Sequence, residues 1–286
     1  MSETTTKAFE LAAAQDQLVN QLRKFESCVV AFSGGVDSAV VAKAAQLALG
    51  EHALAVTGTS ASLAEGELTT ARQVAESIGI RHEVVATDEL ADDAYLANAP
   101  DRCFHCKTEL YGLLSSYATK HGFACVVAGA NLDDLGDFRP GLQAASNHEV
   151  VNPLADCGLA KDHVRQLAKA WDLKVWDKPA TPCLSSRVVY GLEITPERLA
   201  RIDAAEQLLR RLGLATVRVR CHQDELARLE VPVDELPRLC EPQVREQLVT
   251  ELRQLGFGYV TLDLEGFRSG SFQQLVPVEQ LLAAKG

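Results

Sequence analysis

The sequence contains no apolar run approaching the roughly 18 residues that a bilayer crossing needs. Residues 1–7 are polar and lack the basic, apolar or Arg-rich features of export and organelle signals, so we expect a soluble, cytoplasmic protein. No internal repeat or low-complexity tract is present either. The 286 residues are 47% hydrophobic and 23% charged, which is ordinary globular usage and, at about 150 residues per domain, predicts two domains.

Basic residues are too few for a protein that binds bulk nucleic acid. Lys and Arg together number 28 against 39 Asp and Glu, a formal net charge of −11. Neither the part before Tyr190 nor the part after it has a basic excess. Such a field repels a phosphate backbone, so any anion recognised here should be small.

The first part of the chain alternates short β-branched apolar runs with helical stretches. This alternation predicts an α/β fold with a mostly parallel sheet and helices on both faces. The expected strands are residues 28–32, 53–58, 83–86 and 124–128, and the expected helices are 8–25, 37–49, 63–78, 106–120 and 161–171.

From Thr195 the pattern changes to that of a smaller α+β domain. Its expected helices are residues 195–212 and 243–255, and its expected strands are 216–221, 227–231 and 258–262. We therefore predict a domain of residues 1–190 and a C-terminal domain of residues 191–286. How the later strands pair is not derivable from the sequence.

A glycine turn, Ser33-Gly34-Gly35-Val36-Asp37-Ser38, separates the first expected strand from its helix. Its glycines let the backbone approach a ligand, and the helix N-terminus and hydroxyls offer donors to a phosphate. Asp37 could hold Mg²⁺ through its oxygens. The alternative is an ordinary turn with Ser and Asp as helix caps. It is not a Walker A loop, because no Gly-Lys-Ser/Thr follows.

Two cysteines, Cys103 and Cys106, form a C-x-x-C at the start of an expected helix, where the helix N-terminus favours thiolate. Zinc, a redox dithiol and iron–sulfur ligation all remain open, although no second C-x-x-C is present. Cys183 follows two prolines and is either a buried structural cysteine or a reactive or ligating one. The other five are interpreted as packing or idle surface residues: Cys28, Cys125, Cys157, Cys221 and Cys240.

The glycine turn resembles the PP-loop of the ATP pyrophosphatases, and residues 129–134, Gly-Ala-Asn-Leu-Asp-Asp, resemble the second conserved stretch of that fold. The resemblance implies an enzyme that cleaves ATP between the α and β phosphates. Such an enzyme adenylates a substrate oxygen and releases pyrophosphate. The ATP-binding residues would be Ser33, Gly34, Gly35, Asp37 and Ser38.

Taken together, six motifs resemble the LarE family from about residue 20 to 275: residues 33–38, 103–107, 137–141, 181–187, 216–220 and 266–270. The resemblance implies an ATP-dependent sulfur transferase that acts in the synthesis of the nickel-pincer nucleotide cofactor of lactate racemase. The implied substrate is pyridinium-3,5-biscarboxylic acid mononucleotide, whose carboxylate becomes a thiocarboxylate with the use of ATP and Mg²⁺.

Two sulfur strategies are implied by this resemblance. In one, a single cysteine gives up its own sulfur; in the other, three cysteines hold a [4Fe–4S] cluster that delivers an added sulfide. The three-cysteine pattern matches at Cys103, Cys106 and Cys183. Three thiolates leave one iron open to such a sulfide, so we expect the cluster-dependent version, recharged by sulfide or another sulfur donor.

Arg218 and Arg220 alternate on an expected strand and so share one face, where arginine forks suit carboxylate or phosphate. The alternative to a binding site is an exposed strand face that carries ordinary surface arginines. By resemblance they hold the substrate phosphate with Arg187, Arg268 and Glu206. The same resemblance implies that the C-terminal domain closes over the substrate and that the protein is a homo-oligomer.

Three alternatives use the same motifs. A PP-loop enzyme that thiolates tRNA can also use a C-x-x-C and a third cysteine, although the acidic charge opposes it. A non-catalytic nucleotide or iron–sulfur regulator would bind ATP without releasing pyrophosphate. An amide-forming synthetase of the same superfamily would use ammonia and need no cluster.

Overall fold

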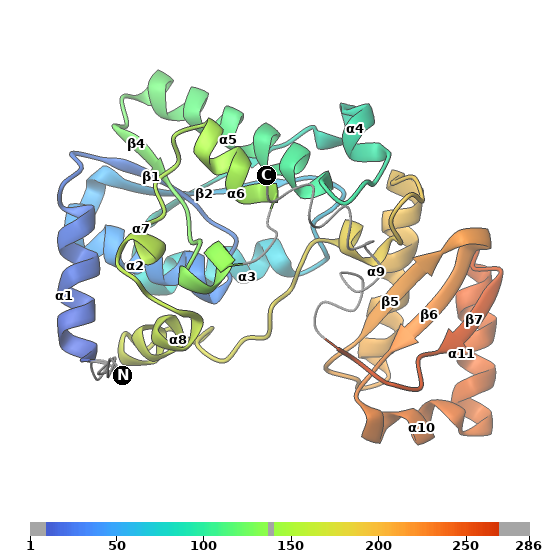
Figure 1. The fold of residues 1–286 in the computed structure, drawn as a ribbon. Coiled ribbons are helices and arrows are strands. Elements are labelled where there is room, and N and C mark those ends of the chain that lie inside the picture. Colours follow the sequence, from blue (N-terminus) through green and yellow to red (C-terminus); the bar gives the residue numbers. More distant parts are fainter. Residues whose placement is uncertain (1–9, 137–139, 269–286) are drawn as a thin grey trace, which may run out of the picture. The chain divides into compact units, whose positions relative to one another are not determined.

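The computed structural model describes residues 10–136 and 140–268, which form two compact units (Figure 1). Unit 1 holds the described residues of Met1–Thr59, Gly66–Thr87 and Cys106–Thr181. Unit 2 holds those of Ser60–Glu65, Asp88–His105 and Pro182–Gly286. Two short early segments therefore belong with the C-terminal residues, and the expectation that residues 191–286 form a domain by themselves stays a prediction.

Unit 1 is built on a four-stranded parallel sheet in the order β3-β2-β1-β4. Its strands contain the expected β-branched runs, and their consecutive crossovers pass through helices, as parallel pairing requires. The expected α/β fold is confirmed. The strands are β1 (Cys28–Ala31), β2 (Ala53–Thr59), β3 (Arg81–Ala86) and β4 (Cys125–Val127).

Helices cover both faces of this sheet (Figure 1). The helix after β1 is apolar nearly all round, as expected for a helix packed between the sheet and several other helices. On the other face, Leu110 lies against Gly58 of β2. The helices are α1 (Leu11–Leu22), α2 (Val36–Leu49), α3 (Glu67–Ile78), α5 (Arg102–His121), α6 (Pro140–Asn147), α7 (Pro153–Asp156) and α8 (Lys161–Ala170).

Two helix starts differ from the sequence expectation. α3 begins at Glu67 rather than at residue 63, because Gly66 takes a left-handed backbone with φ of +83°. α5 begins at Arg102, so the C-x-x-C lies at its very start. The residues of α5 before Cys106 are grouped with unit 2 and the rest with unit 1.

Unit 2 contains a three-stranded sheet in the order β5-β6-β7, with β5 and β6 antiparallel and β6 and β7 parallel. The Thr195 hydroxyl accepts a hydrogen bond from the Arg198 amide at 3.2 Å and so caps the long helix α9. The strands are β5 (Arg218–His222), β6 (Leu226–Glu230) and β7 (Tyr259–Leu262), and the helices are α4 (Asp93–Leu96), α9 (Pro196–Arg211), α10 (Leu236–Cys240) and α11 (Pro242–Gln254).

Single-turn 3₁₀ helices complete the described chain, of which η3 (Leu132–Gly136) and η4 (Leu184–Arg187) carry motif residues. Among residues 10–136 and 140–268, none of the helices is both long and apolar enough to cross a membrane.

Candidate functional site

The glycine turn forms a tight, hydrogen-bonded loop between β1 and α2. The Ser38 hydroxyl accepts from the Ser33 amide at 3.2 Å and donates to the Gly35 carbonyl at 3.0 Å. Gly34 has φ of +70°, and a Cβ there would lie 2.8 Å from the Ala71 Cα, so only glycine fits. The loop therefore sets the backbone amides of the α2 N-terminus toward one spot, which is where an anion is stabilised.

A second motif loop approaches the glycine turn at the same edge of the sheet. The turn follows β1 and residues 129–134 follow β4, and these neighbouring parallel strands end side by side. A Cβ on Gly129 would lie 2.9 Å from the Ser38 amide nitrogen. Because β2 and β4 lie on opposite sides of β1, this is the topological switch point where open α/β sheets bind ligands.

Asp37 lies at the centre of a polar cluster in this crevice. Its Oδ1 accepts from the Asn131 amide at 3.2 Å, and its Oδ2 accepts from the Lys161 ammonium at 2.5 Å. The Asp133 carboxylate accepts from the Lys161 backbone amide at 2.9 Å. Lys161, at the start of α8, carries no motif in the sequence, and only the fold shows that it reaches the glycine turn.

The C-x-x-C cysteines lie one helical turn apart at the start of α5, where Cys103 is exposed and Cys106 is partly buried. Cys183 is partly buried and directly precedes η4. Burial by itself would lower the pKa of the Arg102 guanidinium. The charges of Cys183, Cys103 and two tyrosines together outweigh burial, so the pKa is raised. Unit 2 thus brings Cys103 and Cys183 around one buried cation.

None of the eight cysteines forms a disulfide. Burial raises the pKa of Cys28 and of Cys221 to about 12 and that of Cys125 to about 11, so these thiols are inert, as packing residues are. In the part of the chain that the structure describes, no three His, Cys, Asp or Glu side chains are gathered tightly enough to hold a single metal ion.

Charged residues are buried between α9 and β5 in unit 2. Glu206 is fully buried and accepts from the Arg187 Nε at 2.9 Å and the Arg210 Nη2 at 2.9 Å. Burial alone would raise the pKa of Glu206, but hydrogen bonds from Arg187 outweigh burial, and the pKa is lowered. Arg187 is also fully buried and donates to the carbonyl of Cys183 at 3.0 Å.

Arg218 and Arg220 are only 8% and 6% exposed, which excludes the alternative of a solvated strand face. Arg220 pairs with Glu230 at 2.8 Å, and the Arg218 guanidinium lies 5.2 Å from the centroid of the Phe267 ring. Burial and the nearby Arg187 lower the pKa of Arg218 to about 10. Positive charge is thus crowded in a low-dielectric region, which an anionic ligand would relieve.

Arg268, the last described site residue, is 35% exposed and pairs with Glu265 at 2.8 Å and with Asp263 at 3.5 Å. It follows Phe267 in the chain. Residues 137–139 and 269–270 of two LarE-like motifs lie outside the described residues.

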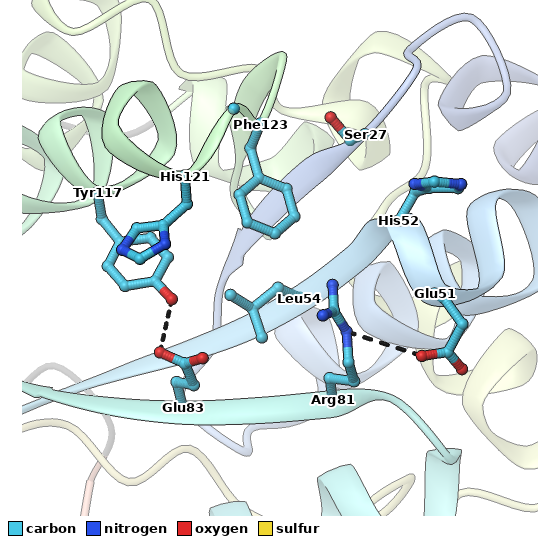
Figure 2. Close-up of a pocket in the computed structure, with 10 residues that line it drawn as sticks. Ser27, Glu51, His52, Leu54, Arg81, Glu83, Tyr117, His121 and Phe123 are labelled. Carbon is cyan, nitrogen blue, oxygen red and sulfur yellow. Dashed lines mark hydrogen bonds and ion pairs between the residues drawn. The ribbon is translucent and has the colours of Figure 1, made fainter.

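A surface depression of about 370 Å³ lies at the opposite edge of the unit 1 sheet (Figure 2). Several of its lining residues precede or begin a strand, as Ser27 does for β1 and Arg81 for β3, and others lie near the end of α5, whereas the glycine turn follows a strand. In Figure 2 the Tyr117 hydroxyl points to Glu83, to which it donates at 2.6 Å. The depression is therefore separate from the crevice that holds Asp37.

Comparison with known proteins places these features in a family. The NAD synthase family model matches residues 10–104. An uncharacterized protein of Synechocystis, slr1717, is 45% identical over 262 residues, which cover 90% of this chain and 97% of that protein. Pyridinium-3,5-bisthiocarboxylic acid mononucleotide synthase of Lactiplantibacillus plantarum is 37% identical over 278 residues, covering 95% and 98%.

A tRNA-specific 2-thiouridylase, MnmA of Maricaulis maris, is 31% identical but covers only 53% of this chain and 46% of its own length. The similarity to the mononucleotide synthase, in contrast, covers 95% of this chain and therefore extends over both units. The chain therefore belongs to the LarE family of the PP-loop ATP pyrophosphatase superfamily.

Proposed function

We propose that this protein is an ATP-dependent sulfurtransferase that converts pyridinium-3,5-biscarboxylic acid mononucleotide into a thiocarboxylate during nickel-pincer nucleotide biosynthesis. The observation that carries the proposal is the 37% identity to the bisthiocarboxylic acid mononucleotide synthase over 95% of the chain. The glycine turn at the sheet's switch point and the cysteines around Arg102 support its two chemical halves.

The first half is adenylation in unit 1. A substrate carboxylate oxygen attacks the α-phosphorus of ATP, and the bond to the leaving pyrophosphate breaks with its electron pair. Ser33, Gly34, Gly35 and Ser38 would hold the phosphates through backbone amides and hydroxyls. Preorganised donors of this kind stabilise charge that grows on the phosphates, which is most of what phosphoryl chemistry asks of a protein.

Magnesium would be held by Asp37, with the Asn131 carbonyl and Asp133 as further oxygen donors. Hard oxygen donors suit this ion, so the residues fit it. When bound, Mg²⁺ neutralises phosphate charge. Asp37 also accepts from Lys161, so that ammonium is placed to move from the carboxylate to a phosphate when ATP and the ion arrive.

The second half is sulfur transfer. A sulfur nucleophile attacks the carbonyl carbon of the acyl adenylate, and AMP leaves with the electron pair of the broken C–O bond. Cys103, Cys106 and Cys183 would hold a [4Fe–4S] cluster, which would supply the sulfide. Cysteine thiolates are the usual ligands of iron–sulfur clusters, so these residue types fit such a group.

The buried charges of unit 2 would bind the phosphate of the mononucleotide. Arg218, Arg220 and Arg268 are the proposed contacts. The Arg187 guanidinium donates to Glu206 and to the carbonyls of Pro182 and Cys183, so we assign Arg187 and Glu206 the task of fixing this region and the Cys183 turn rather than direct binding. We also propose that the protein is cytoplasmic and a homo-oligomer. A sulfide or another sulfur donor would restore the sulfur after each transfer.

The test is anaerobic purification followed by iron and sulfide analysis and single-turnover assays with ATP, Mg²⁺ and the mononucleotide. We expect iron, acid-labile sulfide, stoichiometric pyrophosphate release and a thiocarboxylate detected by mass spectrometry. Cys183→Ala should keep pyrophosphate release and lose the sulfur product. Cys240→Ala, which removes an exposed cysteine outside the set, should behave as the unsubstituted protein. Full activity without iron would contradict the cluster.

Thiolation of tRNA is the second candidate, favoured by the partial match to MnmA. The net charge of −11 opposes it, because phosphate contacts must overcome that field. A gel shift with bulk tRNA at low salt separates the two, since the mononucleotide enzyme should give no shift. ATP binding with no pyrophosphate release under any condition would instead indicate a regulator.

A further inference from the structure

A buried polar network in unit 2 joins the first turn of α5 to the turn that follows Cys183. Arg102 is 5% exposed, and its Nη1 donates to the Ser185 carbonyl at 2.9 Å and to the Asn98 side-chain oxygen. Its guanidinium also lies 5.7 Å from the centroid of the Tyr190 ring. Arg102 directly precedes Cys103, and Ser185 lies two residues after Cys183, so one side chain connects both cysteine-bearing segments.

Asn98 continues this network from the other side. It is fully buried and has a left-handed backbone with φ of +52°. Its Nδ2 donates to the Val189 carbonyl at 2.8 Å and the Leu192 carbonyl at 2.9 Å. The Asn98 side-chain oxygen Oδ1 accepts a hydrogen bond from Arg102. The Asn98 side chain therefore orients the guanidinium and also holds the chain that follows η4.

A further buried contact joins α4 to the turn after Cys183. The Tyr95 hydroxyl and the Ser185 hydroxyl are 2.6 Å apart, and both residues are at most 1% exposed. A buried guanidinium is costly unless its donors are satisfied, and leaving one of its buried partners unpaired is costly as well. Both hydrogen bonds leave one nitrogen, Nη1, whose two hydrogens are fixed in the guanidinium plane, whereas the ammonium of lysine rotates freely on a flexible stem.

We propose that Arg102 is a positioning residue that fixes the Cys183 turn against the first turn of α5, so that Cys103 and Cys183 are presented together. The purpose of that arrangement, holding a sulfur-delivering cluster, rests on the proposed function. The arrangement itself does not rest on that function. No motif identified in the sequence includes Arg102 or Asn98 as a functional residue.

The experiment measures how readily the two thiols are bridged in the reduced, metal-free, full-length chain. N,N′-o-phenylenedimaleimide, a short reagent that adds one thiol across each of two double bonds, is applied to the Cys106→Ser background. Peptide mapping by mass spectrometry then gives the ratio of Cys103–Cys183 bridge to singly reacted thiols. ATP, substrate and iron are absent, so failure of the sulfur-transfer proposal leaves this readout intact.

Arg102→Gln should lower the bridging ratio about fivefold or more, because lost orientation lowers the effective concentration of one thiol at the other. Arg102→Lys should give an intermediate ratio. The control is Arg201→Gln, which removes a partly buried arginine that pairs with Glu225 and lies over Phe257, away from both cysteine segments. All ratios are taken well below each variant's unfolding midpoint.

Suppose a folded Arg102→Gln or Arg102→Lys chain loses stability but keeps the bridging ratio of the unsubstituted protein. This result would show a merely structural role and overturn the proposal. So would failure of the unsubstituted pair to bridge at all. If Arg102→Gln does not fold, the Arg102→Lys ratio decides. Dependence of bridging on Arg102 in a protein that transfers no sulfur would support positioning and reject the proposed function.

Discussion

At the scale of single residues, the structure separates side chains that a motif can reveal from those that only the fold can. Ser33, Gly34 and Asp37 lie in one short turn, so their spacing predicts their meeting. Lys161 reaches Asp37 across 124 positions of the chain, and Arg102 reaches Ser185 across 83. Nothing local marks such residues, because their partners are chosen by the packing of elements rather than by neighbours in sequence.

Gly34→Ala tests whether the glycine turn needs a close backbone approach as well as a left-handed conformation. Gly79, the C-cap of α3, has φ of +77°, and an added Cβ would meet nothing within 4 Å, so Gly79→Ala isolates the conformational cost, about 1 kcal/mol. Gly34→Ala adds a clash with the Ala71 backbone and should cost about 1–3 kcal/mol more. Urea unfolding measures both, and equal losses would contradict the close approach.

The buried carboxylate of Glu206 should make stability depend on acid pH. Its pKa is lowered in the folded state, so the stabilisation it supplies is complete above its unfolded pKa and is lost as pH falls through the folded pKa. Glu206→Gln leaves Arg187 buried without its charge partner and should cost about 3–5 kcal/mol near pH 7.

The measurement is the free energy of unfolding of both proteins from pH 7 to pH 3. Their difference should be constant down to about pH 5 and then shrink below the ordinary carboxyl pKa of about 4.3. Glu76→Gln, an exposed substitution on α3, is measured alongside as the control. A Glu206→Gln difference that does not change with pH would show that Glu206 acts by shape and hydrogen bonding alone.

At the scale of elements, β-branched strands and long helices were predictable and short helices were not. The alternation in unit 1 is confirmed, because its strands are apolar β-branched runs and its longer helices span enough residues to show their period. The helices α4, α7 and α10 have four or five residues, too few for a full amphipathic repeat. The pairing of β5, β6 and β7 depends on long-range contacts that no local pattern encodes.

The strand β3 is an edge of the unit 1 sheet, and its charged residues should protect that edge from pairing with other chains. Glu83 is exposed and precedes Val84 and Val85. Glu83→Val would create three consecutive valines and remove the acceptor of the Tyr117 hydroxyl. Static light scattering during heating should show aggregation at a lower temperature than for Glu76→Val, which lies on a helix. Identical onsets would contradict the protective role.

At the scale of the whole molecule, the chain crosses between its two compact units several times, and this bears on the predicted division at residue 190. Unit 2 includes residues 60–65, 88–105 and 182–190 as well as the C-terminal stretch. The Ile194 amide donates to the Leu96 carbonyl at 2.9 Å, and the Gly191 amide donates to the Asn98 carbonyl at 3.0 Å. The Glu65 amide donates to Asp203 at 3.1 Å.

A fragment of residues 191–286 should therefore be less stable than the same residues in the full chain, since it loses those partners and exposes apolar side chains such as Ile194, which is fully buried. Hydrogen exchange of the β5 amides is the measurement, and we expect it to be about tenfold faster or more in the fragment. A peptide of residues 88–105 added in trans should slow exchange with saturation, whereas a scrambled peptide should not. Equal protection in fragment and full chain would show that residues 191–286 fold as a domain by themselves and that the early segments only lie against a finished surface.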